Sequence, residues 1–487
     1  MAAAFGAADA ARVSAAAREA VDELKVSGVA IGVVSGEILA YSEGFGFADI
    51  ESGRPQDPAL RQRIGSITKT MVGLCAMALV DEGRRTLADR LIDHIPELTI
   101  HGDGASVTVR HLLTHTAGIG EVAMPEDVKD TQATLWSEQP DADVLGLFPK
   151  GLTIDVPPGT KWSYANLGFA LLGEIVERVE GEPIAEVVRR RVFEPLGMTN
   201  SDLLDLPHPD LTTGYHRAPG EDARAFAART GEEIVEEPTV DGVNIRGKYL
   251  YIRGGGAAGA VQSTVPDMAR YAAALLRNGG GIVRPQTFEA MTGPQWQPDT
   301  RLESWGLSFQ RFERFGRRMF GHGGGVIGGW NSMLLISPDD DLAVIVHANC
   351  AFEDLGKLLG RVLAAALDAA PPKLAGEVAP QILAAAPGVY EAIPGQLTNF
   401  RIIGGMGRLQ IKAENGGLTL YARRGPWKGG VRMYPADAAD PGFFRLADDA
   451  FEPSALALIR DAEGQVTGLR CDRLVEMVRT DQVQPWV

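Results

Sequence analysis

Cysteine is scarce in this chain, and the few cysteines present are far apart. The 487 residues include 3 cysteines, Cys75, Cys350 and Cys471, and no CxxC pair. An odd number of widely spaced cysteines provides no disulfide framework, and such scarcity is typical of a reducing compartment. With 45% hydrophobic and 23% charged residues, the composition is that of a globular protein with a large core.

The chain also lacks an excess of basic residues and any long apolar run. Lysine and arginine number 47 against 63 acidic residues, which gives a formal charge of −16. This balance disfavours nucleic acids and anionic membrane surfaces, because both attract basic patches. The chain has no run of 18 apolar residues, so the sequence predicts no membrane span. Residues 1–6 have neither the basic nor the apolar region of a signal peptide, so we expect a cytoplasmic protein if Met1 is the natural start.

The pattern along the chain predicts two parts of different class. Residues 1–372 have β-hairpin patterns near both ends, at 29–41 and 333–347, with helical patterns between them. This order favours an α+β fold, with an antiparallel sheet covered by helices. Residues 373–387 form a proline-containing linker. In residues 388–487, short strand patterns alternate with Gly, Asp and Pro turns, which indicates a small all-β barrel.

Ser66 and Lys69 stand at the start of the longest apolar segment of the first part. The run from Met71 to Leu79 predicts a buried helix, with Gly83 as its C-terminal stop. Residues three apart lie on one face of a helix, so the hydroxyl and the amine are expected to be neighbours. A serine becomes a nucleophile when a nearby base takes its proton, and a desolvated lysine can be that base. The pair therefore predicts a site for acyl transfer.

Two further motifs strengthen this interpretation. Ser163-Tyr164-Ala165-Asn166 precedes a predicted helix, and His322-Gly323-Gly324-Gly325 lies in the strand-rich segment that follows. The chain contains one S-x-x-K, one Y-x-N and one H-x-G match. Three unique matches in this order carry far more information than S-x-x-K alone, which arises about once by chance in a chain of this size.

Together these motifs resemble those of the serine β-lactamase and penicillin-binding-protein superfamily, in particular its class C-like esterases, D-amino-acid peptidases and amidases. The resemblance covers about residues 26–367 and includes the segments 109–118, 164–169 and 195–198. It implies a β-lactamase-like antiparallel sheet flanked by helices, with an all-helical subdomain. The C-terminal part is similar to the lipocalin-like barrel of some members.

The resemblance also implies a role for each motif residue. Ser66 would be the acylated nucleophile, and Lys69 would act as base or as the electrostatic partner of Tyr164. Tyr164 would carry the proton between Ser66, the leaving group and water. The backbone N–H groups of Ser66 and Gly325 would form the oxyanion hole. Because coupled groups titrate as a pair, the choice of base between Lys69 and Tyr164 stays open.

Four further residues are implied in substrate binding: Asn166, His322, Gly323 and Gly324. Asn166 would also hydrogen-bond Lys69, and the glycines would let the substrate lie against the strand. His322 departs from the lysine that β-lactamases and transpeptidases carry at this position. Histidine binds a substrate carboxylate less well than lysine near pH 7, which disfavours β-lactam and cell-wall substrates.

We therefore expect a serine hydrolase that cleaves a small ester or amide, most of all an ester, without a cofactor or metal. D-amino-acid peptidase or amidase activity, β-lactam hydrolysis and a non-catalytic ligand-binding protein are the alternatives. A homo-oligomer is a possible assembly. His111 and His115 have the spacing of a helical metal pair, but no acidic third ligand accompanies them, so we interpret them as structural.

Overall fold

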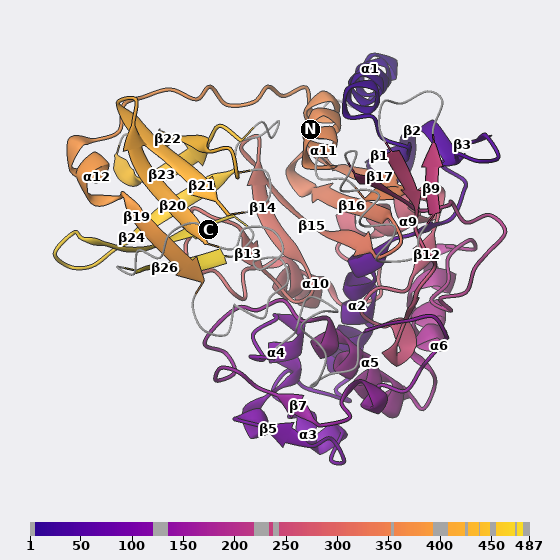
Figure 1. The fold of residues 1–487 in the computed structure, drawn as a ribbon. Helices are drawn as coiled ribbons and strands as arrows, with labels where there is room; N and C mark the ends of the chain where they lie inside the picture. The colour runs from indigo at the N-terminus through magenta and orange to yellow at the C-terminus, as the bar shows by residue number, and fades with distance from the viewer. Residues whose placement is uncertain are drawn as a thin grey trace.

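The computed structural model describes residues 5–119, 135–218, 233–236, 243–351, 355–392, 408–423, 427–437, 439–448, 454–472 and 475–480. These residues form a larger body of helices around a twisted sheet and, beside it, a β-barrel (Figure 1). The fold class expected from the sequence is confirmed.

The central sheet is antiparallel and joins the beginning of the chain to the end of the larger body. Its strand order is β13-β14-β15-β16-β17-β1-β2-β3. The two predicted hairpins are β1–β2 and β16–β17, and β1 pairs with β17 from Val29↔Ala348 to Ser35↔Leu342. The strands are β1 (Gly28–Ser35), β2 (Ile38–Asp49), β3 (Arg54–Pro55), β13 (Ser304–Trp305), β14 (Gln310–Arg314), β15 (Arg317–Val326), β16 (Trp330–Ser337) and β17 (Leu342–Ala348).

Helices cover both faces of this sheet. On the outer face, α1 (Ala7–Leu24) and α11 (Leu355–Leu367) pack against each other and bury Val29, Ile31 and Val344 between themselves and the strands. On the inner face, α9 (Val265–Leu276) packs on β1 and β17. Thr264 caps α9 by accepting a hydrogen bond from the backbone N–H of Asp267.

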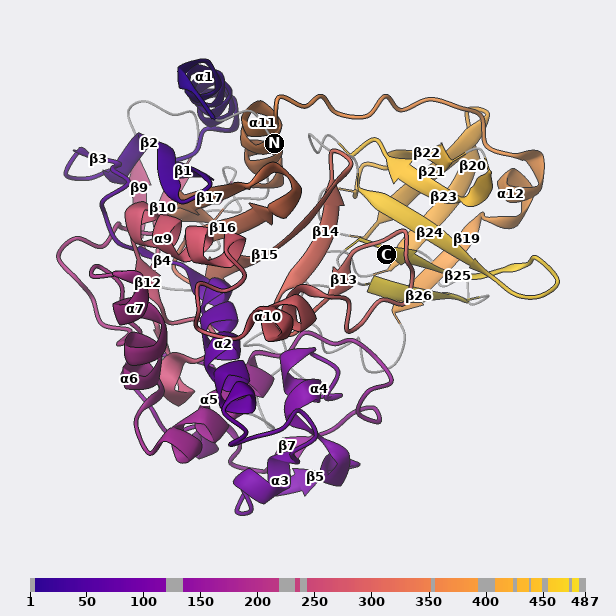
Figure 2. The same ribbon diagram turned by 180° about the vertical axis from the view of Figure 1, so that it is seen from behind.

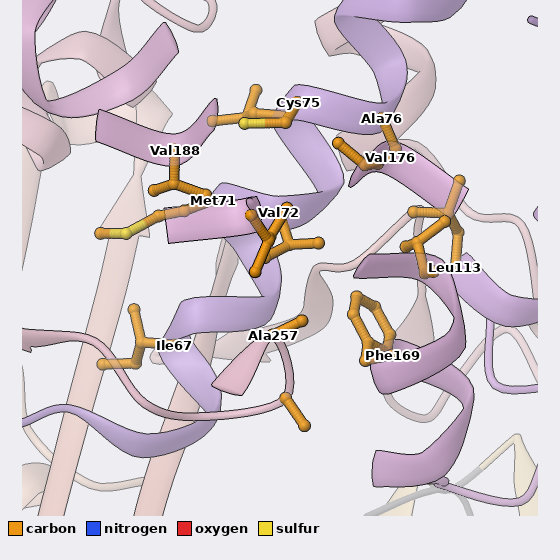
Figure 3. Close-up of a cluster of buried hydrophobic side chains, with 14 of the residues drawn as sticks. Ile67, Met71, Val72, Cys75, Ala76, Leu113, Phe169, Val176, Val188 and Ala257 are labelled. Carbon is orange, nitrogen blue, oxygen red and sulfur yellow. The ribbon is translucent and has the colours of Figure 1, made fainter. Parts of the chain in front are cut away.

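The helix α2 (Thr68–Asp81) runs from the inner face of the sheet into a helical subdomain. From Thr68 to Leu79 every residue of α2 is buried, because neighbours pack around the whole helix rather than on one side. Figure 3 shows Met71, Val72 and Cys75 of α2 among side chains from the surrounding elements, Phe169 and Val188 included. The other helices of the larger body are α3 (Leu91–His94), α4 (Val109–Leu113), α5 (Asn166–Glu180), α6 (Ile184–Val188), α7 (Glu194–Leu196) and α10 (Pro285–Thr292).

Short paired strands connect loops of the larger body. β4 pairs with β12 directly before the Ser66 turn, and β6 pairs with β11; β5 pairs with β7, and β18, β8, β10 and β9 form a small sheet. Their bounds are β4 (Gln62–Arg63), β5 (Ile100–His101), β6 (Trp136–Ser137), β7 (Leu152–Thr153), β8 (Tyr215–Ala218), β9 (Glu233–Glu236), β10 (Val243–Arg246), β11 (Tyr251–Ile252), β12 (Gln262–Ser263) and β18 (Cys350–Ala351).

The C-terminal strands close into a barrel with its own apolar core. Leu409, Leu420, Phe444 and Leu469 are fully buried within it. The barrel lies beside the β13–β14 edge of the sheet in both views (Figure 2). After α12 (Pro380–Ala385) its strands are β19 (Gly388–Ala392), β20 (Leu409–Glu414), β21 (Gly417–Ala422), β22 (Val431–Asp437), β23 (Asp440–Leu446), β24 (Ala455–Arg460), β25 (Val466–Cys471) and β26 (Val475–Thr480).

Polar contacts join the barrel to the larger body. Arg301 pairs with Asp440 of β23, and Lys161 lies 3.5 Å from the carboxylate of Glu476 in β26. Lys161 is three residues before Tyr164, and Arg301 lies shortly before β13. The barrel therefore contacts the segment just before Tyr164 and the segment just before β13.

Some expectations from the sequence are not tested by this fold. The division at 372 and 387 stays a prediction. Of the short strand patterns expected in residues 388–487, the one at residues 399–403 lies outside the described residues. The three cysteines are buried, while the reducing compartment and cytoplasmic location stay predictions. Within the described part of the chain, no helix is long and apolar enough to cross a membrane.

Candidate active site

Ser66 lies in a tight turn that leads directly into α2. Residues Gly65–Ile67 form a single 3₁₀ turn, and α2 begins at Thr68. The expected helix is therefore present, but Ser66 stands just ahead of it rather than in its first α-helical turn. Gly65 has a φ of +55°, a conformation that glycine adopts without steric cost. The turn leaves Ser66 partly exposed, while Lys69 is fully buried.

Lys69 connects Ser66 to the Y-x-N motif. Its Nζ donates to Ser66 Oγ at 2.9 Å and to Asn166 Oδ1 at 2.7 Å, and it also donates to the backbone carbonyl of Ala258. An ammonium has three N–H donors, and these three acceptors match them one to one. Two of these acceptors are carbonyl oxygens, whereas the Ser66 hydroxyl can donate as well as accept, so a neutral amine that accepts from Ser66 fits the contacts as well as an ammonium does.

The glycine-rich part of β15 lies against the Ser66 turn. β14 pairs with β15 only as far as Gly321, so the later residues of β15 are free of that neighbour. A Cβ placed on Gly65 would stand 2.7 Å from the backbone nitrogen of Gly325, which shows how closely the two backbones approach. Gly325 is exposed. The oxyanion hole expected from the backbone N–H groups of Ser66 and Gly325 stays a prediction.

Tyr164 is held in an aromatic cluster immediately before α5. Its side chain is 1% exposed, and Lys69 Nζ lies 5.0 Å from the centre of its ring. The rings of His115, Trp305 and Trp162 lie 4.1, 6.0 and 6.2 Å from that of Tyr164. Burial of the ring on several sides fixes its position relative to Lys69.

Sequence reasoning missed the contributions of Trp162 and Trp305 to this cluster. Trp162 is two residues from Tyr164, but a nearby tryptophan carries no motif. Trp305 comes from β13, far along the chain, and its indole N–H donates to the carbonyl of Leu113 at 3.3 Å. Nothing in the local sequence of either residue could have indicated the contact with Tyr164.

The H-x-G residues occupy two different environments. His322 is fully buried, and its Nδ1 donates to the carbonyl oxygen of Gly323 at 2.5 Å. Its ring lies 6.1 Å from the ring of Tyr164 and 5.4 Å from that of Trp305. Gly324 is buried, whereas Gly323 is partly and Gly325 fully open to solvent. In this structure His322 thus lies beneath the open edge, and its role in substrate binding stays a prediction.

A buried ion pair supports the segment just before Ser66. Arg63 has no exposed surface, and its Nη2 donates to Asp205 Oδ1 at 2.8 Å. Tyr249 donates to the same oxygen at 3.0 Å, and its ring lies 4.4 Å from the Arg63 guanidinium carbon. Burial raises the pKa of Asp205 above its ordinary value, against the opposing charge of Arg63. Tyr249 is part of this network.

His111 and His115 do not form a metal pair. α4 ends at Leu113, and His115 has a φ of +57°, so the two are not on one helical face. His111 Nδ1 accepts a hydrogen bond from the backbone N–H of Thr108, which helps to cap α4. Among the described residues, no group of three or more His, Cys, Asp or Glu is placed to hold a metal ion. Both histidines make structural contacts in the described part of the chain.

Comparisons with known proteins agree with this geometry. The sequence model of the Beta-lactamase family matches residues 13–367, which is more than half of the chain. Esterase EstB of Burkholderia gladioli is 31% identical over 239 residues, which cover 46% of this chain and 58% of EstB. A D-aminopeptidase of Cereibacter sphaeroides is 32% identical over 202 residues, which cover 41% of this chain and 37% of that enzyme. The chain thus spans less than two thirds of the length of these relatives.

A solved structure extends the likeness to the whole fold. The octameric penicillin-binding protein homologue from Pyrococcus abyssi superimposes with a TM-score of 0.59 at 21% sequence identity. The superposition covers 96% of this chain and 99% of that protein. At this identity the likeness concerns the fold, including the part that follows residue 367.

Proposed function

Since the chain belongs to the Beta-lactamase family, we propose that it is a serine hydrolase that cleaves a small ester through an acyl-enzyme on Ser66. One observation carries the proposal: Lys69 Nζ joins Ser66 Oγ and Asn166 Oδ1 by hydrogen bonds of 2.9 and 2.7 Å. This contact brings together two motifs that are about 100 residues apart, beside the open edge of β15. A chain that only bound ligands would gain nothing from a buried lysine in contact with a serine hydroxyl.

In the proposed reaction Ser66 Oγ attacks the carbonyl carbon of the substrate and its proton passes to the Tyr164 phenolate. The carbonyl π electrons move to oxygen, and the N–H groups of Ser66 and Gly325 stabilise that oxyanion. Collapse of the tetrahedral intermediate breaks the bond to the alcohol, which takes the proton from Tyr164. Water then attacks the acyl-enzyme, gives a proton to Tyr164, and releases the acid and Ser66 by the reverse sequence.

Lys69 acts here as a fixed charge rather than as the proton acceptor. As an ammonium that donates to three oxygens, it has no lone pair for the Ser66 proton. Its charge near the Tyr164 ring favours the phenolate over the phenol, because an opposite charge stabilises the ionised form.

Ester substrates are favoured over β-lactams by His322. A buried histidine replaces the lysine that would bind a substrate carboxylate. The similarity to an esterase supports the same choice. Amide cleavage, as in a D-amino-acid peptidase or amidase, is the second candidate, and the similarity to a D-aminopeptidase favours it.

A panel of three chromogenic substrates tests the proposal. p-Nitrophenyl butyrate, D-alanine p-nitroanilide and a cephalosporin reporter are each incubated with the native protein and with Ser66→Ala. Ser66-dependent release of p-nitrophenol, with slower or absent reaction of the other two, is the expected result. Turnover of the anilide faster than that of the ester would favour amide cleavage, the second candidate, over ester cleavage. Equal rates for native protein and Ser66→Ala would refute the mechanism.

A homo-oligomer is a further proposal. The solved homologue from Pyrococcus abyssi is described as octameric, and it superimposes over nearly the whole chain. Light scattering of the purified protein at several concentrations measures the assembly directly. A mass of one chain, about 52.0 kDa, at all concentrations would contradict this proposal.

A further inference from the structure

His115 accepts hydrogen bonds from the residues on both sides of Tyr164. Its backbone carbonyl accepts the N–H of Ser163 at 2.8 Å, and its imidazole Nδ1 accepts the N–H of Ala165 at 3.1 Å. The positive φ of His115 is uncommon for a residue with a side chain, and such conformations persist where surrounding contacts impose them. Both bonds together fix the backbone that carries Tyr164.

The imidazole also fixes the plane of the Tyr164 ring. The two ring centres are 4.1 Å apart with an angle of 32° between the planes. Phe169 and Trp305 hold the imidazole from other directions, with ring centres 5.1 and 5.0 Å away. His115 therefore sets both the backbone position and the ring orientation of the residue that carries the proton.

The hydrogen bond from Ala165 determines the protonation of His115. A backbone N–H can donate only to a ring nitrogen with a free lone pair, so Nδ1 carries no hydrogen and the neutral ring has its proton on Nε2. Protonation of Nδ1 would place the N–H of the His115 ring against the backbone N–H of Ala165, so that two donors would face each other. It would also add a positive charge near Lys69. Among the described residues, the titratable Tyr164 contacts the imidazole directly, and Lys69 and His322 lie against the Tyr164 ring.

We propose that His115, as the neutral imidazole with its proton on Nε2, is a positioning residue for Tyr164 in catalysis. The inference rests on the proposed function of Tyr164. It assigns to His115 a contribution to turnover rather than to substrate binding. A displacement of about 1 Å at a reacting group can cost about 100-fold in rate, and loss of either contact allows such a displacement.

Two variants separate the contacts of His115. His115→Phe keeps an aromatic ring but removes the acceptor of the Ala165 N–H, whereas His115→Asn provides an amide oxygen near the place of Nδ1 and removes the ring. We expect His115→Phe to lower kcat for the best ester by about 100-fold with KM changed less than about threefold. The kcat of His115→Asn should be at least about tenfold higher than that of His115→Phe.

His111 provides the matched control. Its Nδ1 accepts a backbone N–H from Thr108 at 3.2 Å, the same kind of bond as in His115, but no ring contact joins it to Tyr164 in the described structure. His111→Phe should keep kcat within about threefold of the native value, whatever it does to stability. Unchanged kcat in both folded His115 variants would overturn the inference while leaving the Ser66 reaction intact. Native protein that hydrolyses none of the panel would instead refute the proposed function.

A measurement on the native fold completes the test if the variants do not fold. Long-range ¹⁵N–¹H spectra of histidine-labelled protein distinguish the two neutral tautomers from the imidazolium, and the shift of the stacked ring in Tyr164→Phe assigns His115. We expect the Nε2–H tautomer throughout the pH range of full activity. A hydrogen on Nδ1 of His115 in that range would overturn the inference, whatever the variants show.

Discussion

Gly324 lies directly against the chain that leads to Ser66. A Cβ on Gly324 would stand 1.8 Å from the carbonyl oxygen of Ile64 and 2.4 Å from Ser332 Oγ, which itself donates to that carbonyl at 2.7 Å. The strand therefore touches the backbone two residues before the serine. β15 can lie this close to the Ser66 turn only because Gly324 has no side chain.

Gly324→Ala should damage both stability and activity. The added methyl group meets backbone, which cannot move aside without moving Ser66. We expect a loss of about 1–3 kcal/mol in the free energy of unfolding and a fall in kcat/KM of at least about 100-fold. Gly323→Ala is the control, because its Cβ would meet the flexible end of Met333 at 3.1 Å. Urea unfolding of the two variants measures the contrast in stability, and ester turnover of Gly324→Ala measures the loss of activity. Equal stability of the two variants would contradict the expectation.

Lys69→Met should abolish turnover in a folded protein. Three oxygen acceptors lose their donor, and the charge that favours ionised Tyr164 disappears, so kcat/KM should fall at least about 1,000-fold. Lys69→Arg should not restore activity, because a planar guanidinium cannot replace a compact donor with three directed N–H groups. Lys412→Met on the barrel is the matched control and should keep native activity. Turnover of Lys69→Met within tenfold of native would remove Lys69 from the mechanism.

His347 should make the protein less stable in mild acid. Burial lowers the pKa of His347 to about 3. Neither ring nitrogen has a hydrogen-bond partner among the described residues. The unfolded chain binds a proton at this residue below pH ~6.5 and the folded chain does not, so stability is full above that pH and declines as pH falls toward 3.

His347→Leu removes this titration. Between pH 6.5 and 5, the native protein should lose about 2 kcal/mol more unfolding free energy than the variant, at about 1.4 kcal/mol per pH unit. Urea unfolding at both pH values gives the difference. His208→Leu, at a more exposed position, serves as the control. Parallel pH curves for native protein and His347→Leu would contradict the expectation.

Asp472 should have the opposite effect at the contact between the barrel and the larger body. Burial and the nearby negative charge of Glu303 raise the pKa of Asp472 to about 6. Since this value lies above that of the unfolded chain, the stabilising contribution is present below pH ~4 and is lost as pH rises through 6.

Asp472→Asn should therefore stabilise the protein at pH 7.5, by about 1–3 kcal/mol. Its amide oxygen can still accept the N–H of Ala455, which donates to Asp472 at 2.7 Å. Asp440→Asn, which loses the pair with Arg301, should give no gain. Melting temperatures at pH 5 and 7.5 report both variants. A lower melting temperature of Asp472→Asn at pH 7.5 would show that the ionised carboxylate is the stabilising form.

The site residues that sequence reasoning found are those with a local signature. Spacing predicted that Ser66 and Lys69 are neighbours, whereas the hydrogen bond between Asn166 and Lys69 was expected from the family resemblance. The hairpins were predictable because alternating apolar residues and turn residues are local features. The α+β class followed from their order along the chain.

The contacts that shape the site have no such signature. Trp305 contacts Tyr164 from β13, His115 contacts it from the segment after α4, and Arg63 meets Asp205 across 142 residues of sequence. The burial of His322 depends on how these elements close over it. Long-range packing of this kind is decided by the summed fit of many side chains, which no single window of sequence contains.

Covalent labelling of Ser66 tests the central claim most directly. A fluorophosphonate reacts with a serine only where the hydroxyl is activated and the site can stabilise the resulting oxyanion. Intact mass after incubation should show one adduct on the native chain, peptide mapping should place it on Ser66, and Ser66→Ala should remain unlabelled. Lys69→Met should label far more slowly. An unlabelled native protein, or an adduct that persists in Ser66→Ala, would contradict the account.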